Sequence, residues 1–204
     1  PFLADATYHR WLQQPDTGLT KLGETLVKLL RENRILVDVS HMSGRSFDDT
    51  IAYLDDLDGP SGPRTPIIAS HGACRFEHPP GPDGTRKEPL EYNLTDGQIQ
   101  AIVARGGVIG TILCDHYARD GILDHRSRSL EESLDVVVRQ IRRIEVFDPG
   151  LEHVAIGSDH DGFIKPTLAG LEDPGRFQVL ATHLEKVFGA AATSVVVLGA
   201  VWLM

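Results

Sequence analysis

The sequence predicts an α/β fold in which parallel strands alternate with helices, as in half of a (β/α)8 barrel, with residues 1–204 forming one domain. The first observation behind this is that short, β-branched apolar runs alternate four times with helical segments, at about forty residues per cycle. The second is that three of these runs end in a polar side chain. In a barrel the carboxyl ends of the strands converge on the active site, so these side chains should meet.

The four predicted strands are continuous apolar runs of the kind that is buried on both faces in a parallel sheet. They cover residues 35–40, 66–70, 107–113 and 153–158. A flavodoxin-like open sheet is the structural alternative. It would need a glycine-rich phosphate-binding turn after its first strand, and the sequence has none there. The barrel is therefore favoured.

Each predicted helix begins at a polar residue that can cap it. These starts are Thr20, Ser46 with Asp49, Thr95 with Gln98, Ser129 with Glu132, and Asp173 followed by Pro174 at the first turn of a last long helix. Residues 76–92 form a proline- and glycine-rich loop. A loop of this length in a compact unit is usually functional, for example as a lid.

Composition limits the partners and the compartment. The chain has 20 basic and 29 acidic residues, a net charge of −9, which argues against nucleic acid or an anionic membrane as a partner. Cys74 and Cys114 do not form a disulfide scaffold and are expected to be buried thiols. Residues 187–204 carry no charge, but glycines interrupt them, so we favour a buried final helix over a membrane span. The cytoplasm is the favoured compartment.

The strongest candidate site residues are His41, His71 and Asp159. Each histidine ends a predicted strand as part of a Ser-His pair, and neutral imidazole is a common zinc ligand. A carboxylate at Asp159 could accept a proton from a metal-bound water or hold a substrate ammonium group. The alternative is that both histidines are buried and hydrogen-bonded to the backbone, and that Asp159 is a turn residue.

Two residues that border the long loop are candidates for binding substrate. Arg75 and Tyr92 could face an anionic group, Arg75 more strongly because a guanidinium matches a carboxylate. The alternative, that Arg75 is a solvent-exposed loop residue without a role in binding, is at least equally well supported by the sequence. The other histidines at these loops, His78, His116, His125 and His160, give weaker signals.

Five segments occur in an order that resembles the membrane (renal) dipeptidase family of zinc peptidases, peptidase family M19, in its bacterial form. They are LVDVSHMS, PIIASHGA, YNLTDGQIQAIVARGGVIG, HVAIGSDHDGF and GLEDPGRF, and the resemblance covers about residues 18 to 189. It implies a (β/α)8 barrel of the metal-dependent hydrolase type, two zinc ions, and hydrolysis of dipeptides, often with tolerance of D-residues at the C-terminal side.

Residue by residue, the resemblance implies that His41 and His71 hold one zinc ion, and that Asp159 transfers a proton and binds the substrate amine. The family's carboxylate-binding arginine is expected where this chain has Tyr92. The family's first-strand His-x-Asp pair and bridging glutamate belong to an N-terminal half that these residues lack. We therefore expect a C-terminal portion of the barrel, which as given is inactive and, with open sheet edges, can self-associate, for example as a homodimer.

Two other functions remain open. A single-metal amidohydrolase acting on another amide would fit the missing arginine. A non-catalytic barrel with a degenerate site would fit it as well. In the favoured function the partner is a dipeptide or another small amide substrate.

Overall fold

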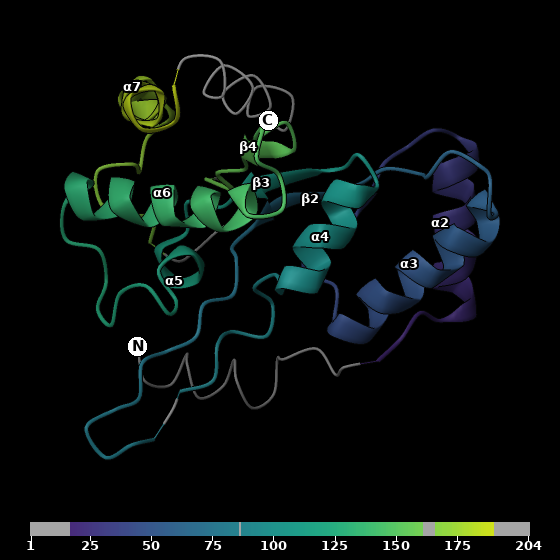
Figure 1. Cartoon of the computed structure of the whole chain (residues 1–204), viewed down its shortest axis with the longest axis horizontal. Coiled ribbons are helices and arrows are strands. Elements are labelled where there is room, and N and C mark those ends of the chain that lie inside the picture. Colours follow the sequence, from purple (N-terminus) through teal and green to yellow (C-terminus); the bar gives the residue numbers. More distant parts are fainter. Residues whose placement is uncertain (1–16, 86, 161–165, 190–204) are drawn as a thin grey trace.

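The computed structural model describes residues 17–85, 87–160 and 166–189 (Figure 1). The final helix expected within residues 187–204 therefore lies almost entirely outside the described residues. Within the described ranges no helix is both long enough and apolar enough to cross a membrane.

The centre of the fold is a four-stranded parallel sheet. Its strands are β1 (Val37–Asp38), β2 (Ile67–Gly72), β3 (Val108–Thr111) and β4 (Val154–Ile156). They lie in the order β1-β2-β3-β4, so strands that are consecutive in the sequence are neighbours in the sheet. This order has no reversal of the kind that defines a doubly wound sheet. The prediction of four βα units from a barrel is confirmed.

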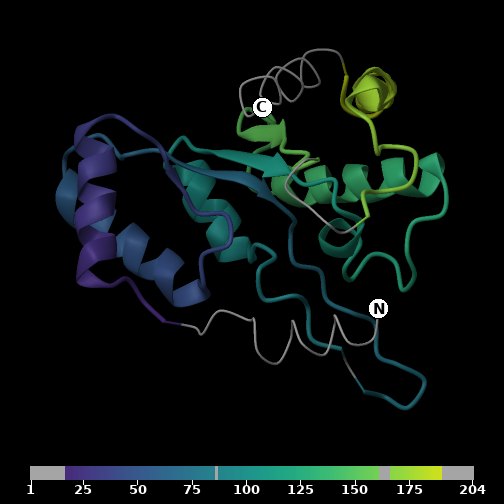
Figure 2. The same ribbon diagram turned by 180° about the vertical axis from the view of Figure 1, so that it is seen from behind.

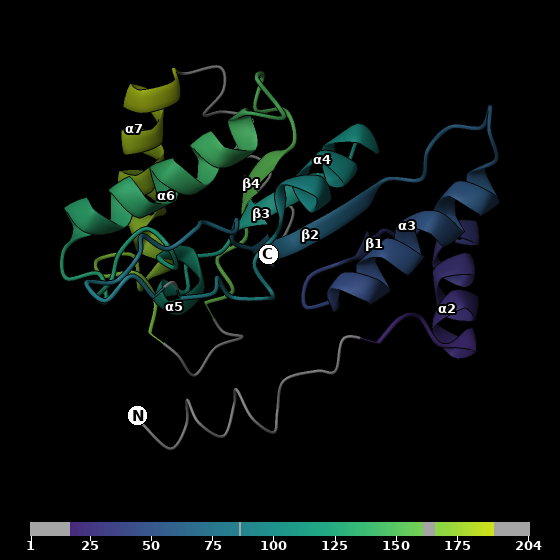
Figure 3. The ribbon, with the colours of Figure 1, turned by 60° about the horizontal axis from the view of Figure 1, so that its bottom comes forward.

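Helices follow the strands in the same spatial order (Figure 3). Helices α4 and α6 pack on β3, and seen from behind both lie beyond the strands, on one face of the sheet (Figure 2). The outer helix α7 packs on α6, and α2 packs on α3. The bounds are α2 Lys21–Glu32, α3 Gly44–Asp58, α4 Asp96–Ala104, α5 Asp115–Ala118, α6 Leu130–Glu145, the 3-10 helix η1 Pro174–Arg176 and α7 Phe177–Phe188.

Most of the predicted helix starts are confirmed, and one is wrong. Thr20, Thr95 and Ser129 cap α2, α4 and α6, and Thr95 forms a reciprocal capping box with Gln98. Helix α3 starts earlier than predicted, because Ser43 caps it by accepting a hydrogen bond from the Ser46 backbone N–H at 3.1 Å.

The predictions for Ser46, for the start of the last helix and for the segment after β3 are corrected as follows by the structure. The Ser46 hydroxyl donates to the Thr17 carbonyl instead of capping a helix. After Asp173 and Pro174 the chain makes one 3-10 turn before α7 begins. The short helix α5 was not predicted at all, since four residues carry no helical periodicity.

The strands are buried less evenly than predicted. Val37 and Val39 are buried against the helices, whereas Asp38 between them is exposed on the other face of the sheet. The expectation of burial on both faces is therefore wrong for β1 and holds for β4, whose three residues are all buried. In β2 the side chains of Ile67 and Ala69 join the core, which leaves Ser70 on the same face as Asp38.

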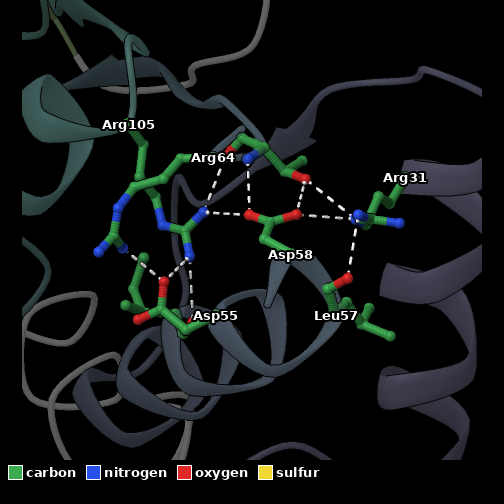
Figure 4. A network of polar contacts seen from close by, with 8 residues as sticks. Arg31, Asp55, Leu57, Asp58, Arg64 and Arg105 are labelled. Atoms are coloured by element: carbon green, nitrogen blue, oxygen red, sulfur yellow. Dashed lines mark hydrogen bonds and ion pairs between the residues drawn. The ribbon is translucent and has the colours of Figure 1, made fainter. Parts of the chain in front are cut away.

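A polar network joins the elements at the amino ends of the strands (Figure 4). The carboxylate of Asp58, at the end of α3, accepts hydrogen bonds from Arg31, Arg105 and the backbone and hydroxyl of Thr65. The Arg105 guanidinium also bonds Asp55 and the Thr65 carbonyl, and its side chain is only 2% exposed. This network ties α2, α3 and the end of α4 to the start of β2.

Candidate functional site

Two histidines meet beyond the carboxyl ends of β1 and β2. His41 follows β1, and His71 lies near the end of β2. Their Nε2 atoms are 2.7 Å apart, and the ring centroids are separated by 4.8 Å. The predicted convergence of the two Ser-His pairs is thus what the parallel register of β1 and β2 produces.

Asp159 approaches the same point from β4, the strand at the opposite end of the sheet from β1. It lies three residues after β4 ends at Ile156, and its Oδ2 is 3.9 Å from the His71 Nε2. Three chain segments that are far apart in the sequence therefore place imidazole and carboxylate groups together at one edge.

Backbone strain coincides with this edge. Non-glycine residues with positive φ in the described part of the chain are Arg34, His41, Leu151 and Asp159, so two of them are candidate site residues. His41 has φ of 63° and Asp159 has φ of 52°. Such conformations cost free energy for L-residues and tend to persist where they aim a functional side chain.

The local electrostatics favour a neutral His41 ring. Desolvation lowers the pKa of His41 below its usual value, and the neighbouring His71 lowers it further, against the opposing effect of Asp159 and Asp38. A neutral imidazole keeps a lone pair that a metal ion can use.

Behind the two Ser-His pairs lies a carboxylate that sequence reasoning missed. Asp38 Oδ1 accepts hydrogen bonds from the backbone N–H groups of Ser40 and Ser70 at 3.0 and 3.1 Å. The Ser70 hydroxyl donates to Asp38 Oδ2 and contacts His71 Nδ1 at 2.9 Å. A charged residue in the middle of an apolar strand was the signal that could have identified Asp38.

A pocket opens next to the histidine pair. Its walls come from the ends of β1 and β2, from the segment before α4, from the first turn of α4 and from α5. They include His41, His71, Glu91, Tyr92, Gln98 and Tyr117. The Tyr92 hydroxyl lies 3.0 Å from the His116 Nε2, and the rings of Tyr92 and Tyr117 are 4.5 Å apart. Tyr92 therefore lines the same pocket as the histidine pair.

Arg75 is placed differently. Its Nη2 donates to the Glu91 carbonyl at 2.6 Å, and it is not among the residues that line the pocket. The guanidinium thus supports the backbone immediately before Tyr92.

The remaining histidines and the cysteines have other contacts. His78 bonds the buried carboxylate of Asp120, which also accepts from Lys87 and the Leu90 backbone and so holds the long loop. His125 pairs with Asp124, and His160 bonds the Leu171 carbonyl. Cys74 and Cys114 are both buried, as predicted, and burial raises the pKa of Cys74 to about 12.

The donor set at this edge suits a metal ion in part. Two imidazole nitrogens that converge on one point are ligands typical of zinc, and a catalytic zinc usually has three protein ligands. Among the described residues no group of three or more histidine, cysteine, aspartate or glutamate side chains is arranged to hold an ion. His41 and His71 can therefore supply two ligands of a site.

A parallel αβ sheet with imidazole and carboxylate groups at its carboxyl edge is typical of barrel hydrolases that use a metal. The family model of membrane dipeptidase (peptidase family M19) matches residues 2–200. The chain belongs to this family of metallopeptidases, and the family implies a metal cofactor.

Relatives and solved structures agree with this assignment. The chain is 32% identical to an uncharacterized protein in the pqqA 5′ region of Klebsiella pneumoniae over 76% of its length, and 30% identical to dipeptidase verJ of Clonostachys rogersoniana over 83%. The crystal structure of dipeptidase AC, a metallopeptidase of family M19, superposes on 95% of the chain with a TM-score of 0.69 at 26% identity. A metallopeptidase from Rhodobacter sphaeroides shares the fold, with a TM-score of 0.65, 24% identity and 95% coverage.

The matches cover only part of these proteins. The chain spans 49% of the Klebsiella protein, 36% of verJ and 50% of dipeptidase AC. It corresponds to about half of a family barrel or less.

Proposed function

We propose that the whole protein is a zinc-dependent dipeptidase, and that residues 1–204 are the C-terminal portion of its single barrel domain. The observation that carries this proposal is the convergence of His41, His71 and Asp159 beyond three parallel strands, in a chain of family M19. The names of two relatives, dipeptidase verJ and dipeptidase AC, support the same substrate class.

In this proposal His41 and His71 hold one of two zinc ions, and ligands from outside these 204 residues complete the centre. Bound zinc activates a water and polarises a carbonyl group. Asp159 takes the proton from the attacking water and delivers it to the leaving amine, and its position beside His71 suits this role. Its carboxylate also attracts the ammonium group of the dipeptide.

The substrate carboxylate needs a hydrogen-bond donor, and we assign Tyr92 to this task because it lines the pocket beside the histidine pair. Arg75 contributes to substrate binding by holding the Glu91 carbonyl and with it the position of Tyr92. Replacing Tyr92 by Phe should raise KM about tenfold, since a hydrogen bond to a charged group is lost, with a smaller change in kcat.

The test is to measure zinc per chain by elemental analysis, and turnover on a panel of dipeptides, with the protein at the full length of its relatives. We expect about two zinc ions, with loss of metal in His41→Ala and His71→Ala. Asp159→Asn should keep its metal and lose about 100- to 10,000-fold in kcat. His125→Ala is the matched control, because this histidine pairs with Asp124 away from the pocket and should change neither quantity.

Other results would redirect the assignment. One zinc ion with activity on another amide would indicate a single-metal amidohydrolase. Folded protein that takes up no zinc would show that the histidines are structural and would refute the proposed enzymatic function.

The isolated 204-residue chain should bind zinc weakly and have no peptidase activity, because its described residues supply two histidine ligands to a metal. Turnover by this chain that a chelator abolishes would contradict the expectation.

A further inference from the structure

The contacts behind His71 continue into the sheet. His71 Nδ1 lies 2.9 Å from the Ser70 hydroxyl oxygen, and this hydroxyl lies 2.5 Å from Asp38 Oδ2 on the neighbouring strand. The other carboxylate oxygen, Oδ1, is fixed by two backbone N–H groups, those of Ser40 and Ser70. The carboxylate therefore cannot turn without losing both backbone bonds.

The direction of these hydrogen bonds follows from counting protons. A carboxylate only accepts, so the single proton of the Ser70 hydroxyl goes to Asp38. Ser70 must then accept from His71, which places the proton of the neutral ring on Nδ1. Desolvation raises the pKa of Asp38, but the hydrogen bonds from Ser70 and Ser40 outweigh it and the net pKa is lowered, so the carboxylate stays ionised at neutral pH.

We propose that Asp38 and Ser70 are positioning residues that hold His71 in the Nδ1–H tautomer, with the Nε2 lone pair directed at the place where a metal ion binds. The opposite nitrogen, Nε2, faces the His41 Nε2 at 2.7 Å. Because His71 has no proton there, His41 donates across this contact in the metal-free protein. His71 is thus ready to bind a metal, whereas His41 must move its proton to Nδ1 first.

The role of a metal ion in this inference rests on the proposed function. The tautomer of His71 in the metal-free protein can be tested independently of that function. The tautomer is read from long-range 1H–15N spectra of the metal-free full-length protein labelled with 15N-histidine, at a pH of about 8, above the ordinary pKa of a histidine side chain. The His71 signals are assigned by their loss in His71→Gln. We expect a protonated Nδ1 and a bare Nε2.

The decisive variant is Asp38→Asn. Its amide oxygen should take the place of Oδ1, which accepts two backbone N–H groups, and its amide nitrogen should then donate to Ser70. The serine proton turns towards His71, and the tautomer should switch to Nε2–H. Ser70→Ala removes the relay and should leave a mixture of tautomers. Asp48→Asn, an exposed carboxylate on α3, is the matched control and should change nothing.

Zinc titration of the full-length protein gives the second readout. Loss of such outer contacts typically weakens metal binding about 10- to 100-fold, and we expect this for Asp38→Asn and Ser70→Ala but not for Asp48→Asn. An Nε2–H tautomer in the wild type, or an unchanged tautomer in Asp38→Asn with backbone signals that show a folded protein, would overturn the proposal. The expected tautomers together with a wild type that binds no zinc would support the relay and refute the zinc site.

Discussion

His41 and Asp159 hold their side chains at the carboxyl edge of the sheet from left-handed backbone conformations. For a residue with a β-carbon this conformation costs roughly 1–2 kcal/mol. The strain is local to the residue, and it aims the imidazole of His41 back across the strand ends towards His71.

At the residue scale we therefore expect His41→Gly to raise the free energy of unfolding by about 1 kcal/mol while it weakens zinc binding. Arg34→Gly is the matched control, since Arg34 has φ of 58° at the other end of β1. It should stabilise the chain similarly and leave zinc binding intact. Urea denaturation and zinc titration measure the two effects, and a destabilised His41→Gly would contradict the strain argument.

At the scale of elements, the Asp58 and Arg105 network joins helices to the sheet at the end opposite the site (Figure 4). Both side chains are 2% exposed, and each satisfies the other's charge. Removing one partner of such a pair leaves a buried charge with fewer partners, which costs more than the pair contributes in place.

Asp58→Ala should therefore destabilise the chain by about 3–5 kcal/mol, whereas Asp56→Ala, an exposed aspartate two residues earlier on α3, should change stability by less than about 0.5 kcal/mol. Urea denaturation of both variants decides the matter. Equal losses would show that the network contributes no more than a surface carboxylate.

The same network predicts a dependence of stability on pH. Desolvation of Asp58 is outweighed by hydrogen bonds from Thr65, Arg31 and Arg105, which lower the pKa of Asp58 from 3.8 to about 2. Because the pKa of Asp58 is lower in the folded than in the unfolded chain, its ionised carboxylate stabilises the folded state at pH values above the unfolded pKa of about 4. This contribution is lost as the pH falls from about 4 to about 2. It amounts to roughly 2 kcal/mol at neutral pH.

We expect the stability gap between wild type and Asp58→Asn to be constant from pH 7 to about 5 and to shrink between pH 4 and 2. Denaturation at several pH values measures this gap. A gap that stays constant down to pH 2 would contradict the assigned pKa.

At the scale of the whole molecule, one side of the structure carries apolar surface without a covering layer in the described residues. Leu22, Leu26 and Leu29 form one stripe on α2 and are half or more exposed, and Ile35 and Leu36 lie just before the edge strand β1. Strand β1 pairs only with β2 among the described strands. Exposed apolar patches beside a sheet edge favour association.

The isolated 204-residue chain should therefore form dimers or larger assemblies, as measured by light scattering after size exclusion. The double variant Leu22→Glu, Leu26→Glu should shift it towards the monomer. Val146→Glu, at an exposed apolar position after α6, is the control and should leave the assembly unchanged. A wild-type chain that is monomeric at high concentration would refute this prediction.

The alternation of strands and helices, most of the helix caps, and the polar residues that end the strands could all be predicted from the sequence. These features are local, because apolar periodicity and capping chemistry depend on residues a few positions apart. The ordered motifs also determined the family, and His41, His71 and Asp159 as its candidate site.

Which of these side chains meet, and which groups support them, depends on contacts between segments far apart in the sequence. The hydrogen bond from Ser70 to Asp38, which supports His71 from behind, depends on the register between β1 and β2, and no local pattern specifies this register. The contacts of Tyr92 with His116 and of Arg75 with the Glu91 carbonyl also join residues far apart in the sequence, so local patterns do not predict them. The left-handed backbone conformation of His41, two residues before the Ser43 cap of α3, is likewise one that the sequence did not reveal.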